Sequence, residues 1–255
     1  MGSVLTLAKM TFKETTREKL FVVFVVFALL IYFISIALGH LSFAEQERIS
    51  LSFGLASMHF VSCMIAIYLG SALYFKEFER KTIHLVLSKP LSRLQYLLGK
   101  FFGFACVLSV FVFGIGLLLA ALVYLNGVVV NPAFIMVVLF VFLEALLILS
   151  VAIFFAHWSR PIVGAFASAS VFLVGHWLES LKFFAERSDS FVFKSLSKFV
   201  VWIWPDLEKL NFRGNFISST SVAGLDMLTT ASYSLFVSSV FLALSHLILT
   251  RKNLV

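Results

Sequence analysis

The sequence predicts an all-α membrane protein that crosses the bilayer six times, with both termini in the cytoplasm. Its composition, its series of long apolar runs and the placement of its basic residues support this prediction. Of the 255 residues, 61% are hydrophobic and 13% are charged, and the mean hydropathy is +1.03. A soluble domain is about half apolar and about a quarter charged. The excess of apolar residues predicts a single transmembrane domain over residues 1–255.

The net charge of +7 does not indicate a nucleic-acid partner. The basic residues lie in short segments beside apolar runs, which is the pattern that sets the topology of membrane proteins. Cys63 and Cys106 both fall within apolar runs. Their placement predicts neither a disulfide framework nor a metal site.

Residues 1–18 are expected to form an amphipathic helix on the cytoplasmic surface of the membrane, in contact with lipid. Leu5, Ala8, Phe12 and Thr15 share one helical face, and the charged residues lie mostly on the other side. An ordinary charged tail is the alternative interpretation.

Six apolar runs are long enough to span a bilayer, because a hydrocarbon core about 30 Å thick requires roughly 20 helical residues. The expected spans cover residues 20–38, 51–74, 96–125, 133–156, 162–181 and 232–249. Asn-Gly and Asn-Pro pairs between the third and fourth runs indicate a turn. Glycine, alanine and serine are frequent in the second and fifth runs, so these two helices are expected to pack closely inside the bundle.

The distribution of lysine and arginine sets the expected orientation. With the N-terminus inside, most of the 20 basic residues lie in cytoplasmic segments, and the short outer loops contain only Arg48. The remaining basic residues lie in or beside the long outer segment 183–231. Long segments cross the membrane largely regardless of their charge.

Residues 75–95 form a strongly charged segment between the second and third predicted spans. Glu77, Arg80 and His84 lie three or four residues apart and can line one helical face, while apolar residues such as Leu85 supply another. We therefore expect a short amphipathic helix on the cytoplasmic membrane surface. A solvated loop is the alternative, and it would explain the basic residues but not the apolar ones.

The same segment also predicts where the third membrane helix begins. Pro90 is expected to bend the chain, and Ser92 is expected to cap a new helix that starts at Arg93.

Glu144 is the one carboxylate well inside a predicted span. An ionisable group at that depth is a candidate functional residue. The alternative is a structural carboxyl that is protonated or bonded to a neighbouring helix. His59 and His40 are expected to be packing or interface residues, and His176 and Glu179 are expected to lie at the solvated outer interface.

The sequence contains no motif for catalysis, for metal binding or for cradling phosphate. We therefore predict no catalytic, cofactor-binding or metal-binding residue and no enzymatic activity in this chain. Any ATP that drives the protein would have to bind to another subunit.

Residues 79–103 resemble the cytoplasmic loop of ABC-2 type transporter permeases. The matching positions are Pro90, Ser92, Arg93, Leu98, Gly99, Lys100 and Gly103. Lys81-Thr82 stands where Gly-Thr is common in that family. Residues 205–211, Pro-Asp-Leu-Glu-Lys-Leu-Asn, are similar to the family's Pro-Asn-Leu-Glu-x-Phe-Asn segment. Within the family, the chain is most similar to the copper-enzyme-maturation permeases of the nitrous-oxide-reductase accessory type.

This resemblance implies a permease that works in the cytoplasmic membrane of a prokaryote. Two copies would pair and bind two ATP-binding subunits, which would hold ATP and magnesium. The residues that it assigns to contact with the ATP-binding subunit are Glu77, Phe78, Glu79, Arg80, Lys81, Thr82, Leu85, Pro90, Ser92 and Arg93. The residues that it assigns to an outer motif are Pro205, Asp206, Glu208 and Asn211. ATP-driven closure of the partner would then drive export or translocation.

Two other functions are compatible with the sequence. One is a membrane transducer or anchor that is driven by the same ATPase and acts on an outer partner at 183–231 without moving a solute. The other is a secondary carrier centred on Glu144. The apolar spans contain no cluster of cysteine or methionine that would favour copper as a substrate.

Overall fold

The computed structural model describes residues 2–41, 46–74, 92–125, 132–214 and 224–251. Every regular element within these ranges is helical. Five helices are long and apolar enough to cross a membrane, and the apolar stretch Phe21–Ile31 is a shorter one. The five candidate spans are Leu51–Leu73, Arg93–Ala121, Ala133–Trp158, Pro161–Arg187 and Gly224–Arg251. The prediction of an all-helical, multi-pass membrane protein is therefore confirmed.

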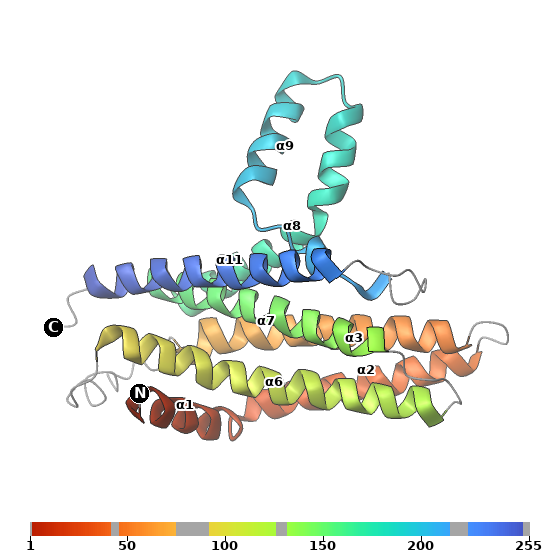
Figure 1. Cartoon of the computed structure of the whole chain (residues 1–255), viewed down its shortest axis with the longest axis horizontal. Coiled ribbons are helices and arrows are strands. Elements are labelled where there is room, and N and C mark those ends of the chain that lie inside the picture. Colours follow the sequence, from red (N-terminus) through yellow and green to blue (C-terminus); the bar gives the residue numbers. More distant parts are fainter. Residues whose placement is uncertain (1, 42–45, 75–91, 126–131, 215–223, 252–255) are drawn as a thin grey trace.

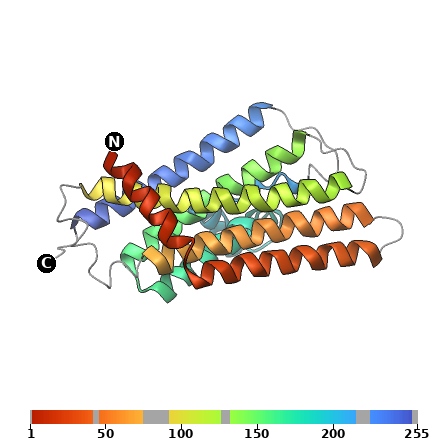
Figure 2. The same ribbon diagram turned by 90° about the horizontal axis from the view of Figure 1, so that it is seen from below.

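The bundle is built from long helices that run side by side (Figures 1 and 2). Their bounds are α2 Lys19–Leu41, α3 Gln46–Tyr68, α6 Arg93–Leu125, α7 Pro132–Trp158, α8 Pro161–Arg187 and α11 Gly224–Arg251. Helix α7 lies at the centre, since it packs against α3, α6, α8 and α11. Its sequence is apolar on nearly all sides, which is typical of a helix that has neighbours on several sides.

Helix α3 continues into the π-helical turn η1, Leu69–Leu73, which packs tightly on α7. A Cβ atom added at Gly70 would lie 2.5 Å from Ala152 Cβ, so only glycine permits this approach. Most of this span is buried, as its small residues predict. The fifth span fits that prediction only in part, because Gly164, Ser168 and Gly175 are buried whereas Ser170 is exposed.

Helix α1, Gly2–Thr15, packs across the start of α6 (Figure 2). Its buried face contains Leu7, Ala8, Thr11 and Thr15. Leu5, which was predicted to share the lipid-facing side of the helix with Ala8, is 75% exposed. The side of α1 that packs is set by glycines on α6, which allow Leu7 rather than Leu5 to contact that helix.

Two glycines of the segment 79–103, which resembles the cytoplasmic loop of ABC-2 permeases, make this contact possible. A Cβ atom at Gly99 would lie 2.7 Å from Leu7 Cδ2, and one at Gly103 would lie 2.6 Å from Thr11 Cβ. Real Cβ atoms do not approach other carbon atoms so closely, so a larger residue at either position would push α1 away.

The start of α6 agrees with the prediction. Ser92 Oγ accepts a hydrogen bond from Gln95 N at 3.2 Å, and Gln95 Oε1 accepts one from Ser92 N at 3.0 Å. This reciprocal pair is a capping box. The helix accordingly begins at Arg93.

The C-terminal part of α8 and helix α9, Phe191–Ile203, form a hairpin that projects from the side of the bundle (Figure 1). Ser190 caps α9 by accepting a hydrogen bond from Phe193 N at 3.4 Å. Ser197 is the buried residue of α9, and the helix exposes large apolar side chains. Those exposed side chains are Phe191, Val192, Phe193, Leu196, Phe199, Trp202 and Ile203.

Two predicted boundaries need correction. The fifth span was expected to end at residue 181, but α8 continues to Arg187 and into the projecting hairpin. The sixth was expected to begin at residue 232, but α11 begins at Gly224, so the end of the predicted outer segment 183–231 is helical. Both extensions contain polar residues, such as Glu186 and Asp226. Because these terminal turns are polar, an apolar run ends before them even though the helix continues.

Candidate functional site

Most residues predicted to contact an ATP-binding subunit fall outside the described residues. These are Glu77, Phe78, Glu79, Arg80, Lys81, Thr82, Leu85 and Pro90. His40 also lies where no side chain is described. Ser92 and Arg93 are described, and both are engaged at the start of α6.

Arg93 ties the start of α6 to the end of α11. Its Nη1 donates hydrogen bonds to the carbonyl oxygens of Leu249, at 2.7 Å, and Thr250, at 2.8 Å. Carbonyls in the last turn of a helix have no partner within that helix, and the helix dipole favours a cation there. Arg93 therefore holds the start of α6 against the end of α11.

Tyr74, the described residue that precedes 75–91, is also attached to the core. Tyr74 is fully buried, and its hydroxyl lies 2.9 Å from His157 Nε2 on α7. His157 Nδ1 lies 2.8 Å from the carbonyl oxygen of Ile153. A carbonyl only accepts, so Nδ1 is the protonated nitrogen and Nε2 accepts from the Tyr74 hydroxyl when the imidazole is neutral.

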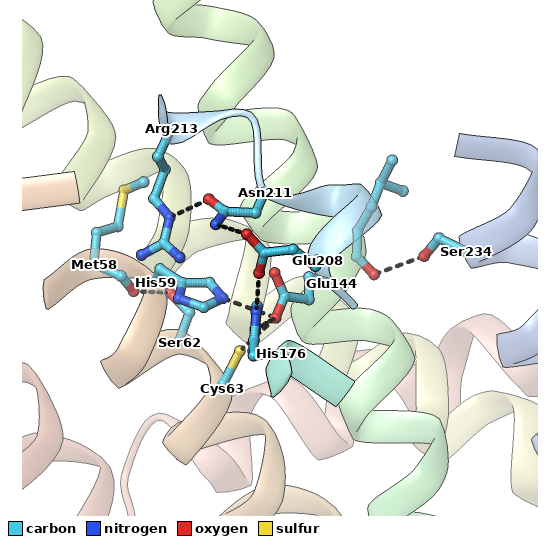
Figure 3. A network of polar contacts seen from close by, with 11 residues as sticks. Met58, His59, Ser62, Cys63, Glu144, His176, Glu208, Asn211, Arg213 and Ser234 are labelled. Atoms are coloured by element: carbon cyan, nitrogen blue, oxygen red, sulfur yellow. Dashed lines mark hydrogen bonds and ion pairs between the residues drawn. The ribbon is translucent and has the colours of Figure 1, made fainter. Parts of the chain in front are cut away.

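Glu144 lies at the centre of a buried polar cluster (Figure 3). Its side chain is 1% exposed, and two imidazoles from other helices converge on its Oε1 atom. His176 Nε2 on α8 lies 2.8 Å from this oxygen with hydrogen-bond geometry. His59 Nε2 on α3 lies at 2.8 Å as well, but without the direction of a hydrogen bond.

These positions bear on two expectations. His59 was expected to be a packing or interface residue, and it is buried beside Phe172, but it also lies against Glu144, a contact that the sequence did not indicate. His176 was expected at a solvated interface, yet its side chain is only 16% exposed and contacts two carboxylates. Glu144 itself is bonded to neighbouring helices, which is the structural alternative that the sequence left open. Glu179 is exposed, as predicted.

The outer motif continues the same cluster. Glu208, in the short 3₁₀ turn η2 Glu208–Leu210, places Oε2 2.9 Å from His176 Nδ1. Asn211 Nδ2 donates to Glu208 Oε1 at 2.7 Å, and Arg213 Nε donates to Asn211 Oδ1 at 2.8 Å. A continuous polar chain therefore runs from Glu144 through His176 and Glu208 to Arg213 (Figure 3).

The rest of the outer motif fastens the returning chain to the helices. Asp206 N donates to the Tyr233 hydroxyl on α11 at 2.8 Å, and Lys182 Nζ on α8 lies 3.1 Å from Asp206 Oδ2. Leu207 is fully buried, and its N–H donates to the Gly175 carbonyl at 3.3 Å. Pro205 approaches the same glycine, since a Cβ atom there would lie 3.0 Å from the Pro205 oxygen.

The electrostatics of Glu208 follow from its partners. Its partial burial alone would raise the pKa of the carboxyl. Hydrogen bonds from His176 and Asn211 and the nearby charge of Arg213 outweigh this, and the pKa of Glu208 is lowered below its ordinary value. Glu208 is therefore an anion at neutral pH.

The geometry of His176 constrains its protonation. A neutral imidazole has one donor nitrogen and one acceptor nitrogen. Both nitrogens of His176 face carboxylate oxygens, which accept but do not donate when ionised. With both carboxylates ionised, either the ring carries a second proton, or a cation lies between Nε2 and Glu144.

Sequence reasoning missed this cluster because its members come from separate helices. The available signal was the cost of burying ionisable groups in a membrane. Three such groups, His59, Glu144 and His176, occur within apolar runs, and groups of this kind usually pair with one another. The outer motif at 205–211 was identified, but its contact with Glu144 was not.

Comparison with known proteins agrees with the motifs. A family model described as "ABC-2 family transporter protein" matches residues 5–254. A comparison with curated proteins finds no match. The match includes the cytoplasmic motif, the outer motif and every long helix. The chain is an ABC transporter permease, and it belongs to the ABC-2 family.

Proposed function

We propose that two copies of this chain form the membrane part of an ATP-driven complex that exports or translocates a substrate across the cytoplasmic membrane of a prokaryote. Members of the ABC-2 family work with separate ATP-binding subunits and are not themselves catalytic. Two such subunits would hold ATP and magnesium, and this chain would bind no cofactor. The subgroup of copper-enzyme-maturation permeases remains part of the proposal.

One observation carries the proposal. The described residues on either side of 75–91 are both tied to other helices, Tyr74 to His157 on α7 and Arg93 to the last turn of α11. A partner that moves this segment would therefore move α7 and α11 as well. This is the connection that a coupling segment requires.

The proposed topology has six spans with both termini in the cytoplasm. Helix α2 would be the first span, and its apolar stretch Phe21–Ile31 supports this assignment. Helix α1 would lie at the cytoplasmic membrane surface. Its exposed side carries Lys9 and Lys13, and the exposed Arg17 follows it, which suits a surface of anionic lipid.

The projecting hairpin favours a second function, that of a transducer acting on an outer partner. Helix α9 exposes aromatic side chains together with Lys194 and Lys198. Such a face suits either the outer membrane interface or a protein partner. In this alternative the ATPase would drive the partner, and no solute would move.

The experiment exchanges charges within the cytoplasmic motif. Glu79→Lys combined with Arg80→Glu is expected to reduce co-purification of the ATP-binding subunit by about tenfold, since a like-charge contact costs roughly 1.4 kcal/mol or more. The matched control is Glu186→Lys with Arg187→Glu, which makes the same exchange on the exposed hairpin. Equal recovery of the partner with both variants would contradict the proposal.

Transport assays in proteoliposomes separate the two functions. ATP-dependent movement of a solute supports export. ATP hydrolysis that requires an outer partner, with no solute moved, supports the transducer. Solute movement driven by an ion gradient without any ATPase would instead indicate a secondary carrier and overturn both.

A further inference from the structure

We propose that His59, Glu144 and His176 bind one zinc-class divalent metal ion, which joins α3, α7 and α8 in the core of the bundle. This site goes beyond the proposed function, because neither the family assignment nor the cytoplasmic motif requires a metal. It also revises the expectation from the sequence that the chain has no metal ligands. The three residues are far apart in the sequence, so they do not form a recognisable metal-binding motif.

The geometry suits such an ion. One ligand atom from each residue, two imidazole nitrogens and a carboxylate oxygen, lies within 4.8 Å of the others. Tetrahedral zinc with bonds of about 2.1 Å places its ligand atoms roughly 3.4 Å apart. The present distances of 2.8 Å from each Nε2 to Glu144 Oε1 require only a small expansion around the ion. Imidazole and carboxylate ligands together favour zinc over magnesium or calcium.

His59 provides an independent observation. Its side chain is 5% exposed, and its Nε2 atom has no hydrogen-bond partner although it lies beside Glu144 Oε1. A buried polar atom without a partner is costly. A metal ion between the imidazole and the carboxylate would give this nitrogen a ligand bond, because a neutral imidazole nitrogen donates its lone pair to a metal.

Glu208 supplies the support that metal-binding histidines usually have. A histidine ligand commonly donates its other N–H to a carboxylate, which fixes the orientation of the ring. His176 presents Nε2 to Glu144 and Nδ1 to Glu208, at 2.8 and 2.9 Å. Asn211 and Arg213 hold Glu208 in turn. The ligand and its outer partner are thus both present.

The net charge of the cluster is compatible with a bound cation. Glu144 and Glu208 each contribute one negative charge, and Arg213 contributes one positive charge. With neutral imidazoles the cluster carries a net charge of −1, and such a charge in a membrane interior attracts a cation. A divalent ion would change the net charge to +1, whereas one added proton would bring it to zero. A second proton on His176 is the competing solution, and it would fill the position that the metal would take. Cys63 Sγ lies 3.9 Å from Glu144 Oε1 and is a neighbour rather than one of the three ligands.

The test measures metal in the detergent-purified permease, prepared without a polyhistidine tag. After incubation with Zn²⁺ and removal of excess ion, elemental mass spectrometry is expected to find about one zinc per chain. Substitution with Co²⁺ is expected to give the visible absorption of a tetrahedral site with nitrogen and oxygen ligands. His59→Gln and His176→Gln are each expected to abolish both signals.

Two further variants provide a change that spares the ligands and a control outside the cluster. Glu208→Gln leaves all three ligands in place and is expected to weaken Zn²⁺ binding about 10- to 100-fold. His246→Gln, on α11, removes a histidine outside the cluster and is expected to retain full binding. If a ligand variant fails to fold, the Glu208 variant still measures the site.

Either of two results would overturn the proposal. The folded wild type could bind no stoichiometric Zn²⁺ or Co²⁺, which would leave a protonated His176 as the explanation of the cluster. Alternatively, the His59 and His176 variants could bind as much metal as the His246 variant. Neither measurement uses the ATP-binding subunit or transport, so failure of the metal site would be distinct from failure of the permease function.

Discussion

The two motif-bearing regions of the molecule satisfy their polar groups in different ways. Around the start of α6, the contacts are backbone caps and close glycine packing, as with Arg93, Gly99 and Gly103. Around the outer motif, the contacts join ionisable side chains, with Glu144, His176 and Glu208 as the chain. The first region therefore depends chiefly on shape and the second on charge balance. Substitutions that change size or charge separately can distinguish the two.

The largest effect is expected at the buried carboxylate. Glu144→Ala leaves two imidazoles, or a bound cation, without their anion, and removal of one partner from a buried pair costs about 3 kcal/mol or more. Thermal unfolding in detergent is expected to show a clear loss of stability. Glu179→Ala removes an exposed carboxylate from α8 and is the control. Equal unfolding temperatures for Glu144→Ala and Glu179→Ala would mean that the charge of Glu144 does not stabilise the cluster.

A smaller effect is expected where α1 packs on α6. Gly103→Ala places a Cβ atom 2.6 Å from Thr11 Cβ and 2.9 Å from the backbone oxygen of Ala8, so it is expected to cost about 1–3 kcal/mol. Displacement of α1 would also speed tryptic cleavage at Lys9. Gly114→Ala is the matched control, because nothing lies within 4 Å of the added atom. If Gly114→Ala exposes Lys9 equally, the packing explanation fails.

The smallest effect is expected from the pH dependence of Glu208. Because its pKa in the folded protein is lowered, its contribution to stability is present above the ordinary carboxyl pKa of about 4.3 and is lost as the pH falls through the folded value. Unfolding temperatures measured from about pH 6 down to about pH 2 should therefore decline below about pH 4. Glu208→Gln is expected to flatten that decline. An unchanged acid slope in this variant would show that another carboxylate is responsible.

Much of the fold could be predicted from local patterns. The apolar runs predicted where the long helices lie, most of their ends within a few residues, and Ser92 correctly indicated the start of α6. The packing of Leu7 and Thr11 on α6 was not predicted, because it depends on the glycines of a helix that is distant in the sequence. The ends of α8 and α11 were misplaced because their terminal turns mix polar and apolar residues.

The candidate site was predicted only in pieces. Glu144 and Glu208 were both singled out, the first for its depth in a span and the second for its place in a family motif. Neither pattern indicated that His176 lies between them. A contact of this kind depends on which helices are neighbours and on how each is rotated, and a single sequence records neither directly.

By itself, the sequence determined that this protein is a helical membrane protein with the motifs of an ABC-2 permease. Those properties follow from hydrophobicity, helix caps and short motifs, which act over a few residues at a time. Only the tertiary structure decided that His59, Glu144, His176 and Glu208 form one buried cluster. Packing of α3, α7 and α8 brings these groups together, and the cost of an isolated charge in a low-dielectric interior then requires each of them to find a partner.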